Sequence, residues 1–542
     1  MKKTYYIILC FVALLFTACK DYLTAPEPGA THLEAYYTSG QACINNVNGC
    51  YVPLMWEFSS TYCSEWFIGD VMSDDALKGG QNTNDMAAAF DLENWRTVSN
   101  NDIAYDVYRA NFYGIARCNM ALHHIPNAAL DSVMNASVKQ RLLGEAKFLR
   151  AFYYFRLVRI FGGVPLTLDV INDDTKWTMP RASVDDVFKA IIADLEDAEK
   201  GLWNKSEYPA SDLGRATKGA AQAMLMKTYL YMASPYWNKQ VSLSADKCYE
   251  QAHIWGEKLM QAAESGEYTL CADYADNFTL EGENGPESIF EIQYVEDGTS
   301  DYGANEGGFG ATRGTFTVIL TRSRSSQIGG EGWGFNKPTN NLYAEYEEGD
   351  LRRDATIFNP HDSLMENKNE EIYLGTRYLN RKYALYNNDQ GTEFYKLAHA
   401  TRGPLNNKQI RLADAYLMYA EACLGTGDEG TAKTYINKVR DRVGLPHVGE
   451  YSITVNGETI ANPTVEQCLK HERRMELAME GHRWFDLVRY GNTKAHMDAY
   501  AATETQEARA QMNTFVEGVH ELLPIPSKER QLNTALTQNN GY

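Results

Sequence analysis

The stretch GEAKFLRAFYYFRLVRIFGGVPL, residues 144–166, decides the fold, because it carries apolar side chains on more than one helical face. One apolar stripe repeats every three or four residues and comprises Ala146, Leu149, Tyr153, Leu157 and Ile160. A second stripe is formed by Phe148, Phe152 and Phe155. Gly162, Gly163 and Pro165 then end the helix, since glycine adopts helix-ending backbone angles and proline cannot continue a helix. The stretch predicts a helix in the middle of a helical stack.

Helical periodicity returns in several later blocks of the chain. GRATKGAAQAMLMKTYLYMA from Gly214 and CYEQAHIWGEKLMQAAES from Cys248 each predict one helix. IRLADAYLMYAEACLGTGDEGTAKTYINKVRDRVGLP, residues 410–446, predicts two antiparallel helices around a Gly-Thr-Gly-Asp turn. The small Ala420 and the apolar positions of the second helix partly fit the tetratricopeptide pattern, although no strict 34-residue period is present. We therefore expect a mainly α protein built on helical hairpins.

The composition predicts a folded chain with a net negative charge. Of 542 residues, 44% are hydrophobic and 12% aromatic, enough to bury a large core. Lys and Arg total 51 against 71 Asp and Glu, for a net charge of −20 at pH 7. A protein that binds nucleic acid by neutralising phosphates needs the opposite balance, so we expect no nucleic-acid partner. The 35 Tyr and 9 Trp residues suit wet binding surfaces, because their rings join an apolar face to a polar tip.

The first thirty residues have the pattern of an export signal. Two lysines precede an apolar run from Tyr5 to Phe16, and small residues stand directly before Cys19. The residues ending at Cys19 resemble a bacterial lipobox, in which the cysteine is acylated, for example with palmitate, and becomes the first mature residue. We expect a lipoprotein signal peptide over residues 1–18 and a polar tether over 19–30; a secretory signal cleaved after Ala18 without lipidation is the alternative.

The cysteines that follow the leader do not have the spacing of a metal site. Their separations are wide and irregular, and no pair of Cys-x-x-Cys units occurs. We expect no bound metal and eight buried free thiols: Cys43, Cys50, Cys63, Cys118, Cys248, Cys271, Cys423 and Cys468.

The search for catalytic motifs gives no positive result. In HERRMELAMEGHRWFDLVRYG, from His471, Met475 stands where a zinc protease needs its second histidine. The charged residues of this stretch recur at helical spacing and indicate a partly buried structural helix. The glycine-rich GGFGATRG and GGEGWGFNKP lack the context of a phosphate loop, and no Gly-x-Ser-x-Gly elbow is present. We predict a protein that is not an enzyme and uses no cofactor.

Two regions break the helical pattern. Residues 53–101 and about 266–408 are rich in Gly, Asn, Asp and aromatic side chains, and the second contains short extended runs such as SIFEIQYV. Long irregular segments on a rigid frame often carry binding groups, so we expect function in these two regions.

Several long blocks together resemble one family. Besides residues 144–166, the block from Gly214 and the first half of 410–446, they are GWGFNKPTNNLYAEYEEGDLRRDATI, INKVRDRVGLP, ERRMELAMEGHRWFDLVRYG and LLPIPSKERQLNTALTQNNGY. Matching blocks run in order from about residue 20 to Tyr542, and they resemble the RagB/SusD family. The resemblance implies an outer-membrane, surface-exposed lipoprotein of a Bacteroidetes bacterium, built on tetratricopeptide-like helices. It also implies a lid on a SusC-like TonB-dependent transporter, which captures glycans or other nutrients without catalysis.

The resemblance also sets the expected domain organisation. We expect a single SusD-like domain over residues 31–542, with a helical scaffold over about 31–265 and 409–542 and an irregular insertion over about 266–408 that carries short strands. Glycan capture is the leading hypothesis. Capture of a peptide or another nutrient, or transporter docking without sugar binding, is the alternative, and a surface hydrolase is disfavoured by the missing motifs.

The candidate ligand residues come from the two irregular regions. A sugar packs its C–H groups against an aromatic face, and its hydroxyls need donors and acceptors, which Trp or Tyr with Asp, Asn or Arg supplies. For each aromatic, packing against the scaffold is the competing interpretation. The candidates are Trp66, Asp74, Asn82, Tyr302, Asn305, Arg313 and Trp333.

Overall fold

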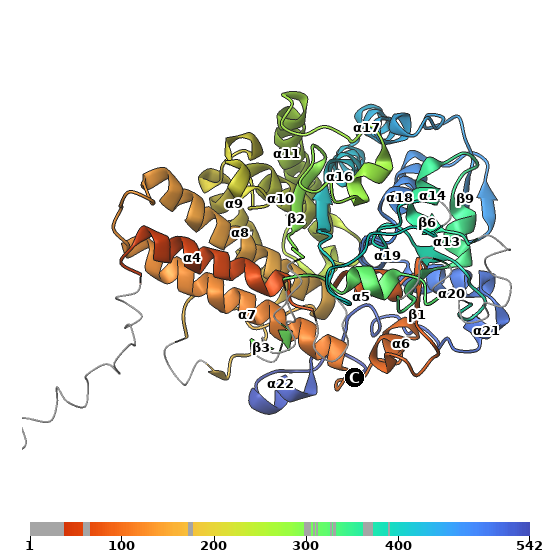
Figure 1. Ribbon diagram of the computed structural model, residues 1–542, viewed down its shortest axis with the longest axis horizontal. Helices are drawn as coiled ribbons and strands as arrows, with labels where there is room; N and C mark the ends of the chain where they lie inside the picture. Colours follow the sequence, from red (N-terminus) through yellow and green to blue (C-terminus); the bar gives the residue numbers. More distant parts are fainter. Residues whose placement is uncertain are drawn as a thin grey trace, which may run out of the picture.

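The computed structural model describes residues 37–57, 65–171, 177–296, 305–306, 309–310, 313–325, 328, 332–360, 372–388 and 391–542. The long helices of residues 40–264 gather on one side of the molecule, and most of the shorter helices and strands lie on the other (Figure 1). The proposed acylation site Cys19 lies outside the described residues. Among the helices that are described, none combines the length and the apolar character needed to cross a bilayer.

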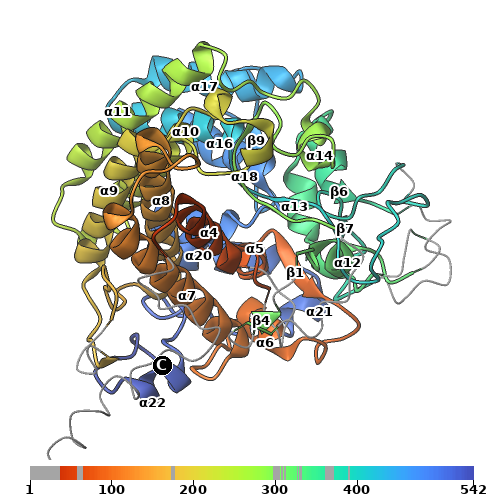
Figure 2. The ribbon, with the colours of Figure 1, turned by 60° about the vertical axis from the view of Figure 1, so that its left-hand side comes forward.

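The scaffold consists of long helices that pack against their neighbours in sequence. Close pairs are α7 with α8, α8 with α9, α10 with α11, and α16 with α17. Figure 2 shows α7, α8 and α9 on one side of the molecule, and α13, α14, β6 and β7 on the other. The expected mainly α, tetratricopeptide-like scaffold is confirmed. The long helices are α4 (Gly40–Tyr51), α7 (Asp102–His124), α8 (Ala136–Phe161), α9 (Val184–Gly201), α10 (Lys218–Ala233), α11 (Ala245–Glu264), α16 (Leu412–Gly425), α17 (Glu429–Arg442) and α18 (Val465–Leu477).

Helix α8 contains the stretch that decides the fold. Asn135 caps it, because its side-chain oxygen accepts a hydrogen bond from the Val138 amide at 3.0 Å. Gly162, at φ 73°, ends it. Tyr153 is fully buried, and a Cβ at Gly114 of α7 would lie only 2.3 Å from its ring, so the two helices approach closely. The prediction that neighbouring helices enclose this one is confirmed.

Shorter helices occupy the loop-rich regions and the C-terminal part of the chain. The α-helices are α5 (Glu65–Val71), α6 (Ala87–Glu93), α12 (Thr317–Thr321), α13 (Asn340–Glu345), α14 (Leu351–Thr356), α19 (Arg483–Tyr490), α20 (Thr493–Thr503), α21 (Gln506–Arg509) and α22 (Ser527–Leu532). The 3-10 turns are η1 (Val52–Leu54), η2 (Ile125–Asn127), η4 (Lys205–Glu207), η5 (Ala210–Asp212), η6 (Asn238–Gln240) and η7 (Tyr274–Phe278).

The described strands form antiparallel pairs. They are β1 (Ala76–Gly79) with β5 (Phe335–Pro338), β2 (Ser288–Ile292) with β8 (Asn407–Arg411), β3 (Asn305–Glu306) with β4 (Phe309–Gly310), β6 (Ile357–Phe358) with β7 (Leu379–Asn380), and β9 (Ile453–Val455) with β10 (Glu458–Ile460). The pair β2–β8 closes the base of the irregular insertion, with Ser288 opposite Arg411. The pair β1–β5 joins the two loop-rich regions, with Gly79 opposite Phe335. The insertion therefore returns to the scaffold at both ends.

A buried ion-pair network connects the C-terminal helices to the rest of the chain. Glu476, on α18, bonds Arg442 Nη2 at 2.5 Å and Arg352 Nη1 at 3.1 Å. Arg411 pairs with Glu287 at 2.8 Å and also with Glu476. All of these side chains are at most 3% exposed. The prediction of a structural helix in this stretch is confirmed, although its charges are more deeply buried than we expected.

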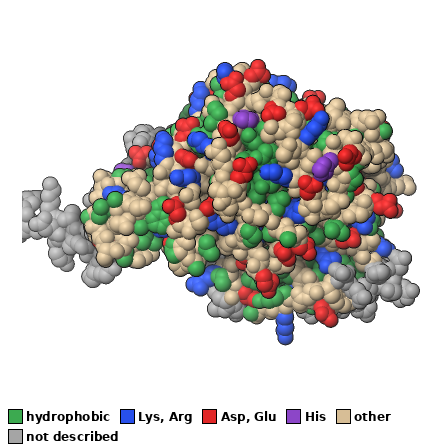
Figure 3. Space-filling model, turned by 90° about the horizontal axis from the view of Figure 1, so that it is seen from above, with side chains coloured by type: hydrophobic (Ala, Val, Ile, Leu, Met, Phe, Trp, Pro, Cys, Tyr) green, Lys and Arg blue, Asp and Glu red, His purple; other side chains and the backbone are tan. Residues whose placement is uncertain are grey.

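The described cysteines lie in the interior, and charged side chains of both signs lie on the surface. Of the eight predicted free thiols, all but Cys63 are described; they are buried and carry no disulfide, whereas Cys63 lies outside the described residues. On the face shown in Figure 3, acidic and basic side chains are interspersed among neutral and hydrophobic ones. That face has no broad basic field of the kind that binds nucleic acid.

Candidate functional site

The two loop-rich regions meet along one line, which we call the loop seam: the described residues of 76–85 and 313–338. Strands β1 and β5 pair along it, and the Gly80 amide donates to the Gly334 carbonyl at 2.8 Å. Gly79 has φ 80°, and a Cβ there would lie 2.2 Å from the Gly334 carbonyl oxygen. Glycine is therefore required for this close approach. The seam brings residues more than 230 positions apart in the sequence into contact.

Asn82 lies at an exposed turn of the loop seam. Its side-chain oxygen accepts hydrogen bonds from the amides of Asn84 at 2.9 Å and Asp85 at 3.2 Å. Beneath the turn, the Lys78 ammonium donates to the carbonyl oxygens of Asn82, at 2.9 Å, and Asp85. The same ammonium lies 5.2 Å from the Tyr373 ring centroid. The turn is thus fixed from below, while Asn82 faces solvent.

Trp333 is half-buried on the insertion side of the seam. Its backbone amide donates to the Ile319 carbonyl at 2.8 Å, and its ring centroid lies 6.0 Å from that of Phe316. Glu57, from the first loop region, accepts hydrogen bonds from the Phe316 amide at 2.6 Å and the Thr315 hydroxyl at 2.5 Å. Burial raises the pKa of Glu57 to about 7. Glu57 therefore ties the backbone at Thr315 and Phe316, on which Trp333 packs, to the first loop region.

Two arginines and a tyrosine add polar groups near the seam. Arg313 is exposed, and its carbonyl oxygen accepts from the Val295 amide at 2.9 Å. Arg324 places Nη1 3.9 Å from a carboxylate oxygen of Asp85. Tyr113 of α7 is 41% exposed and packs edge-on against Trp56 at 5.6 Å. This area can stack an aromatic ring on a flat apolar ligand face and donate hydrogen bonds around it.

The structure places the predicted site residues in three situations. Asn82, Arg313 and Trp333 belong to the loop seam and reach solvent at least in part. Trp66 lies in α5 and Asn305 in β3, but the side chains of both fall outside the described residues, as does the whole of Tyr302. Tyr113 and Arg324 were not among the candidates: Tyr113 lies in a scaffold helix, and nothing in the local sequence distinguishes Arg324 from the other polar residues of the second loop-rich region.

Asp74 differs from the other candidates, because it lies in the core. It is 0% exposed, and its carboxylate bonds Arg483 Nε at 2.7 Å, Arg474 Nη2 at 3.0 Å and His496 Nε2 at 2.7 Å. Arg474 and Arg483 hold the pKa of Asp74 well below its ordinary value, despite the opposing effect of burial. A ligand contact needs an oxygen that faces solvent, and Asp74 offers none here. Its carboxylate stabilises the fold.

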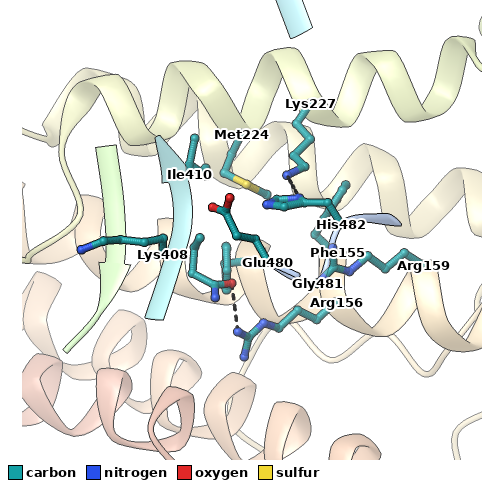
Figure 4. A pocket seen from close by; sticks show the side chains of 12 residues that line it. Phe155, Arg156, Arg159, Met224, Lys227, Lys408, Ile410, Glu480, Gly481 and His482 are labelled. Carbon is teal, nitrogen blue, oxygen red and sulfur yellow. Dashed lines mark hydrogen bonds between the residues drawn. The ribbon is translucent and has the colours of Figure 1, made fainter. Parts of the chain in front are cut away.

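A second cluster of titratable groups surrounds a small internal cavity (Figure 4). The cavity measures about 30 Å³, and Lys227, Glu480 and His482 are among its lining residues. Lys227 Nζ lies 3.5 Å from His482 Nδ1 and 3.4 Å from a carboxylate oxygen of Asp414. A space of this size holds about one water molecule and no substrate. The arrangement is therefore structural.

The buried His482 makes stability depend on pH. Burial, with a contribution from Lys227, lowers the pKa of His482 to about 3. Below an unfolded-state pKa of about 6.5, only the unfolded chain takes up this proton, so stability is lost as pH falls from 6.5 towards 3. We expect the fall in Tm between pH 7.5 and pH 5.0 to be smaller in His482→Asn than in the wild type, by the equivalent of at most about 2 kcal/mol.

Thermal unfolding followed by circular dichroism at the two pH values measures this effect. Raised pKa values at carboxyls such as Glu57 act in the opposite direction, but they are present in both proteins and cancel in the comparison. His447→Asn, at a half-exposed surface histidine, is the matched control. Equal falls in Tm for wild type and His482→Asn would show that this histidine does not titrate on unfolding.

Two family models match most of the chain. The model described as the SusD family matches residues 286–542, and the model described as starch-binding associating with outer membrane matches residues 38–230. A SusD-like protein of Bacteroides ovatus is 27% identical over 499 residues, which are 90% of this chain and 82% of that protein. The two family models cover most of the helical scaffold and both sides of the loop seam.

Solved structures are similar over nearly the whole chain. A laminarin binding SusD-like protein has a TM-score of 0.74 at 27% identity, covering 93% of this chain and 100% of that chain. Surface glycan-binding protein A from Bacteroides uniformis has a TM-score of 0.71 at 26% identity, covering 92% of this chain and 99% of that chain. Sequence and fold agree, and the chain belongs to the RagB/SusD family.

Proposed function

We propose that the protein captures glycans at the cell surface and delivers them to a SusC-like TonB-dependent transporter. The observation that carries the proposal is the loop seam, where paired strands join the segment of the exposed Asn82 to the segment of the half-buried Trp333 and the exposed Arg313. The laminarin binding relative and the starch-binding family description support a glycan as the ligand class.

Binding at the seam follows from the chemistry of its side chains. The Trp333 ring offers an apolar face for the C–H groups of a sugar, and its packing on Phe316 limits its freedom before the ligand arrives. The Asn82 amide and the Arg313 guanidinium supply hydrogen bonds to hydroxyls. No bond in the ligand is broken in this proposal, which needs neither a metal nor a cofactor, and the protein acts as a binding protein and not as an enzyme.

The remaining candidates extend the same site. Trp66 and Asn305 belong to elements of the two loop-rich regions, and Tyr302 precedes Asn305 by three residues. We assign all three to ligand contact, on the chemical grounds that selected them from the sequence. Asp74 has a supporting role, because its ion pairs hold α19 against the segment that leads into β1.

The leader determines where the protein acts. Acylation of Cys19 after removal of residues 1–18 would attach the chain to the outer membrane, and residues 19–30 would form the tether. Two or more acyl chains suffice for stable anchoring. A position at the surface places the body, expected as one domain over residues 31–542, beside its transporter.

Calorimetric titration of the soluble chain, starting after Cys19, against laminarin, starch and further polysaccharides tests the function. For the glycan that binds, Trp333→Ala should weaken affinity about tenfold or more, since a central aromatic contact typically contributes at least 1.4 kcal/mol. Trp177→Ala is the matched control, because Trp177 is a 63% exposed tryptophan that is not part of the seam.

Two outcomes would count against this proposal. Equal affinities of Trp333→Ala and wild type would remove the seam as the site. If no glycan of the panel binds, the alternatives are favoured, in which the aromatic and polar loops bind a peptide or only dock the transporter. Thermal unfolding of both variants separates a lost contact from a lost fold.

A further inference from the structure

A second cavity opens on the insertion, and none of its described lining residues belongs to the loop seam. It measures about 460 Å³, and its described lining residues come from 273–281, 351–355 and 381–395. Turn η7, helix α14 and a short hairpin therefore surround it. Its volume lies in the range of about 300–1,000 Å³ that is typical of small-molecule sites.

The apolar floor of this insertion cleft is rigid. Phe278, Leu385 and Ala355 line it, and Phe278 packs in a small hydrophobic cluster with Val443 and Leu445 of the scaffold. The Lys382 ammonium lies 4.7 Å from the centroid of the Phe278 ring. A ring held by a buried cation and by apolar neighbours needs no reorganisation before it meets a ligand.

Two tyrosines stand on one wall, and the protein fixes both. Tyr386 forms an isolated β-bridge with Phe394, and the Tyr395 amide donates to the Leu385 carbonyl at 3.0 Å. The Tyr395 hydroxyl donates to Glu296 at 2.7 Å, and the Tyr386 hydroxyl accepts from the Ser323 amide at 3.1 Å. Both ring positions are thereby defined, and the rings add flat apolar surface to the cleft.

The rim of the cleft is polar and mainly acidic. Asp273, Glu281 and Asp354 supply three exposed carboxylates, whereas Arg381 is the one guanidinium among its described lining residues. Arg381 donates to the Asp354 carbonyl at 3.2 Å, so it is tied to the rim itself. Asn387 is exposed and can both donate and accept. An acidic rim repels anionic ligands such as uronates or sulfated sugars and leaves hydrogen-bonding groups for neutral hydroxyls.

We propose that the insertion cleft is a second saccharide-binding site, which takes one or two units of a neutral sugar chain. The proposal rests on the proposed function for the class of ligand, but it uses different residues from the loop seam. Aromatic walls, an apolar floor and a ring of hydroxyl-binding groups are the features that sugar recognition needs. Two sites on one body would hold a long polysaccharide more tightly than either site alone.

The number of bound short oligosaccharides distinguishes one site from two. Laminaritetraose and maltotetraose are titrated calorimetrically into the wild-type soluble chain, into Trp333→Ala and into the double variant Asp354→Ala/Asn387→Ala. We expect two molecules per wild-type chain and one per variant, with affinity at the altered site reduced at least tenfold. Asp498→Ala/Asn492→Ala, at exposed positions on and next to α20, is the matched control and should keep two.

A blocking variant provides an independent measurement. Ala275→Trp would fill the cleft from η7, where Ala275 is half-exposed, and should leave one bound tetrasaccharide whether or not the rim substitutions disturb the hairpin. If the wild type binds one tetrasaccharide and Ala275→Trp also binds one, the proposal of a site in the cleft is wrong and the seam remains the site. If neither sugar binds to the wild type, both proposals are wrong. If the wild type binds one tetrasaccharide and only the cleft variants lose it, the cleft is the site and the proposal for the seam is wrong.

Discussion

Replacing Glu476 with glutamine should lower the free energy of unfolding by about 3–5 kcal/mol, because it leaves buried guanidinium groups without a compensating charge. Glu476 is 0% exposed and bonds Arg411, Arg442 and Arg352. These cations hold the pKa of Glu476 well below its ordinary value. The amide of glutamine would keep one acceptor oxygen but direct its N–H groups at the arginines. Water cannot supply the missing hydrogen-bond acceptor in the core.

The same helix supplies the control for this prediction. Glu466 on α18 is 67% exposed in its side chain and pairs with Lys470 at 2.6 Å. Glu466→Gln removes a surface pair of the i,i+4 type, so its cost should stay below about 1 kcal/mol. Urea unfolding at pH 7 measures both variants against the wild type. Comparable losses of unfolding free energy in Glu466→Gln and Glu476→Gln would mean that the buried network stabilises the fold no more than a surface ion pair does.

The helical scaffold could be predicted from the sequence, because its information is local. Apolar side chains of α8 recur at helical spacing, and Gly162 marks the helix end directly. The Gly-Thr-Gly-Asp turn marks a hairpin, because α16 ends at Gly425 and α17 begins at Glu429. Burial on several faces was foreseeable as well, since a helix that is apolar nearly all round needs cover.

The buried ion-pair network could not be predicted in the same way. Arg474 donates to the Asp74 carbonyl across 400 positions of sequence, and nothing near either residue reports the other. Charged side chains at helical spacing indicate a solvated face as readily as a buried network, because burial depends on the partner that the fold supplies. The same ambiguity made Asp74 a reasonable ligand candidate.

The candidate sites also differ in how far the sequence predicts them. Asn82 and Arg313 could be selected because polar residues in glycine-rich loops face solvent. The insertion cleft was missed, because it forms only when η7, α14 and the hairpin come together. One local signal was available: Tyr386 and Tyr395 flank the sequence NNDQGTEF, a turn-rich segment typical of a hairpin. That signal predicts a hairpin but not the cleft beside it.

Replacing Asp74 with asparagine should also destabilise the fold by about 3–5 kcal/mol. The substitution removes the charge that compensates Arg483 and Arg474, whose side chains are at most 9% exposed. The low pKa of Asp74 means that its stabilising effect is present above about pH 3.8 and is lost as pH falls below that value. The difference in unfolding free energy between wild type and Asp74→Asn should therefore shrink in strong acid.

Asp75 is the matched control, because the neighbouring carboxyl is equally buried but less well compensated. One of its oxygens accepts from Arg474 at 2.9 Å, whereas the other has no hydrogen-bond partner among the described residues, and burial raises its pKa. Asp75→Asn keeps the bonded oxygen, so it should cost about 1 kcal/mol or less. If Asp74 contacted ligand instead, Asp74→Asn would weaken glycan binding with little change in Tm. Because the Asp74 carboxylate is enclosed, we expect a large loss of stability, whereas the protein that remains folded should bind glycan with unchanged affinity.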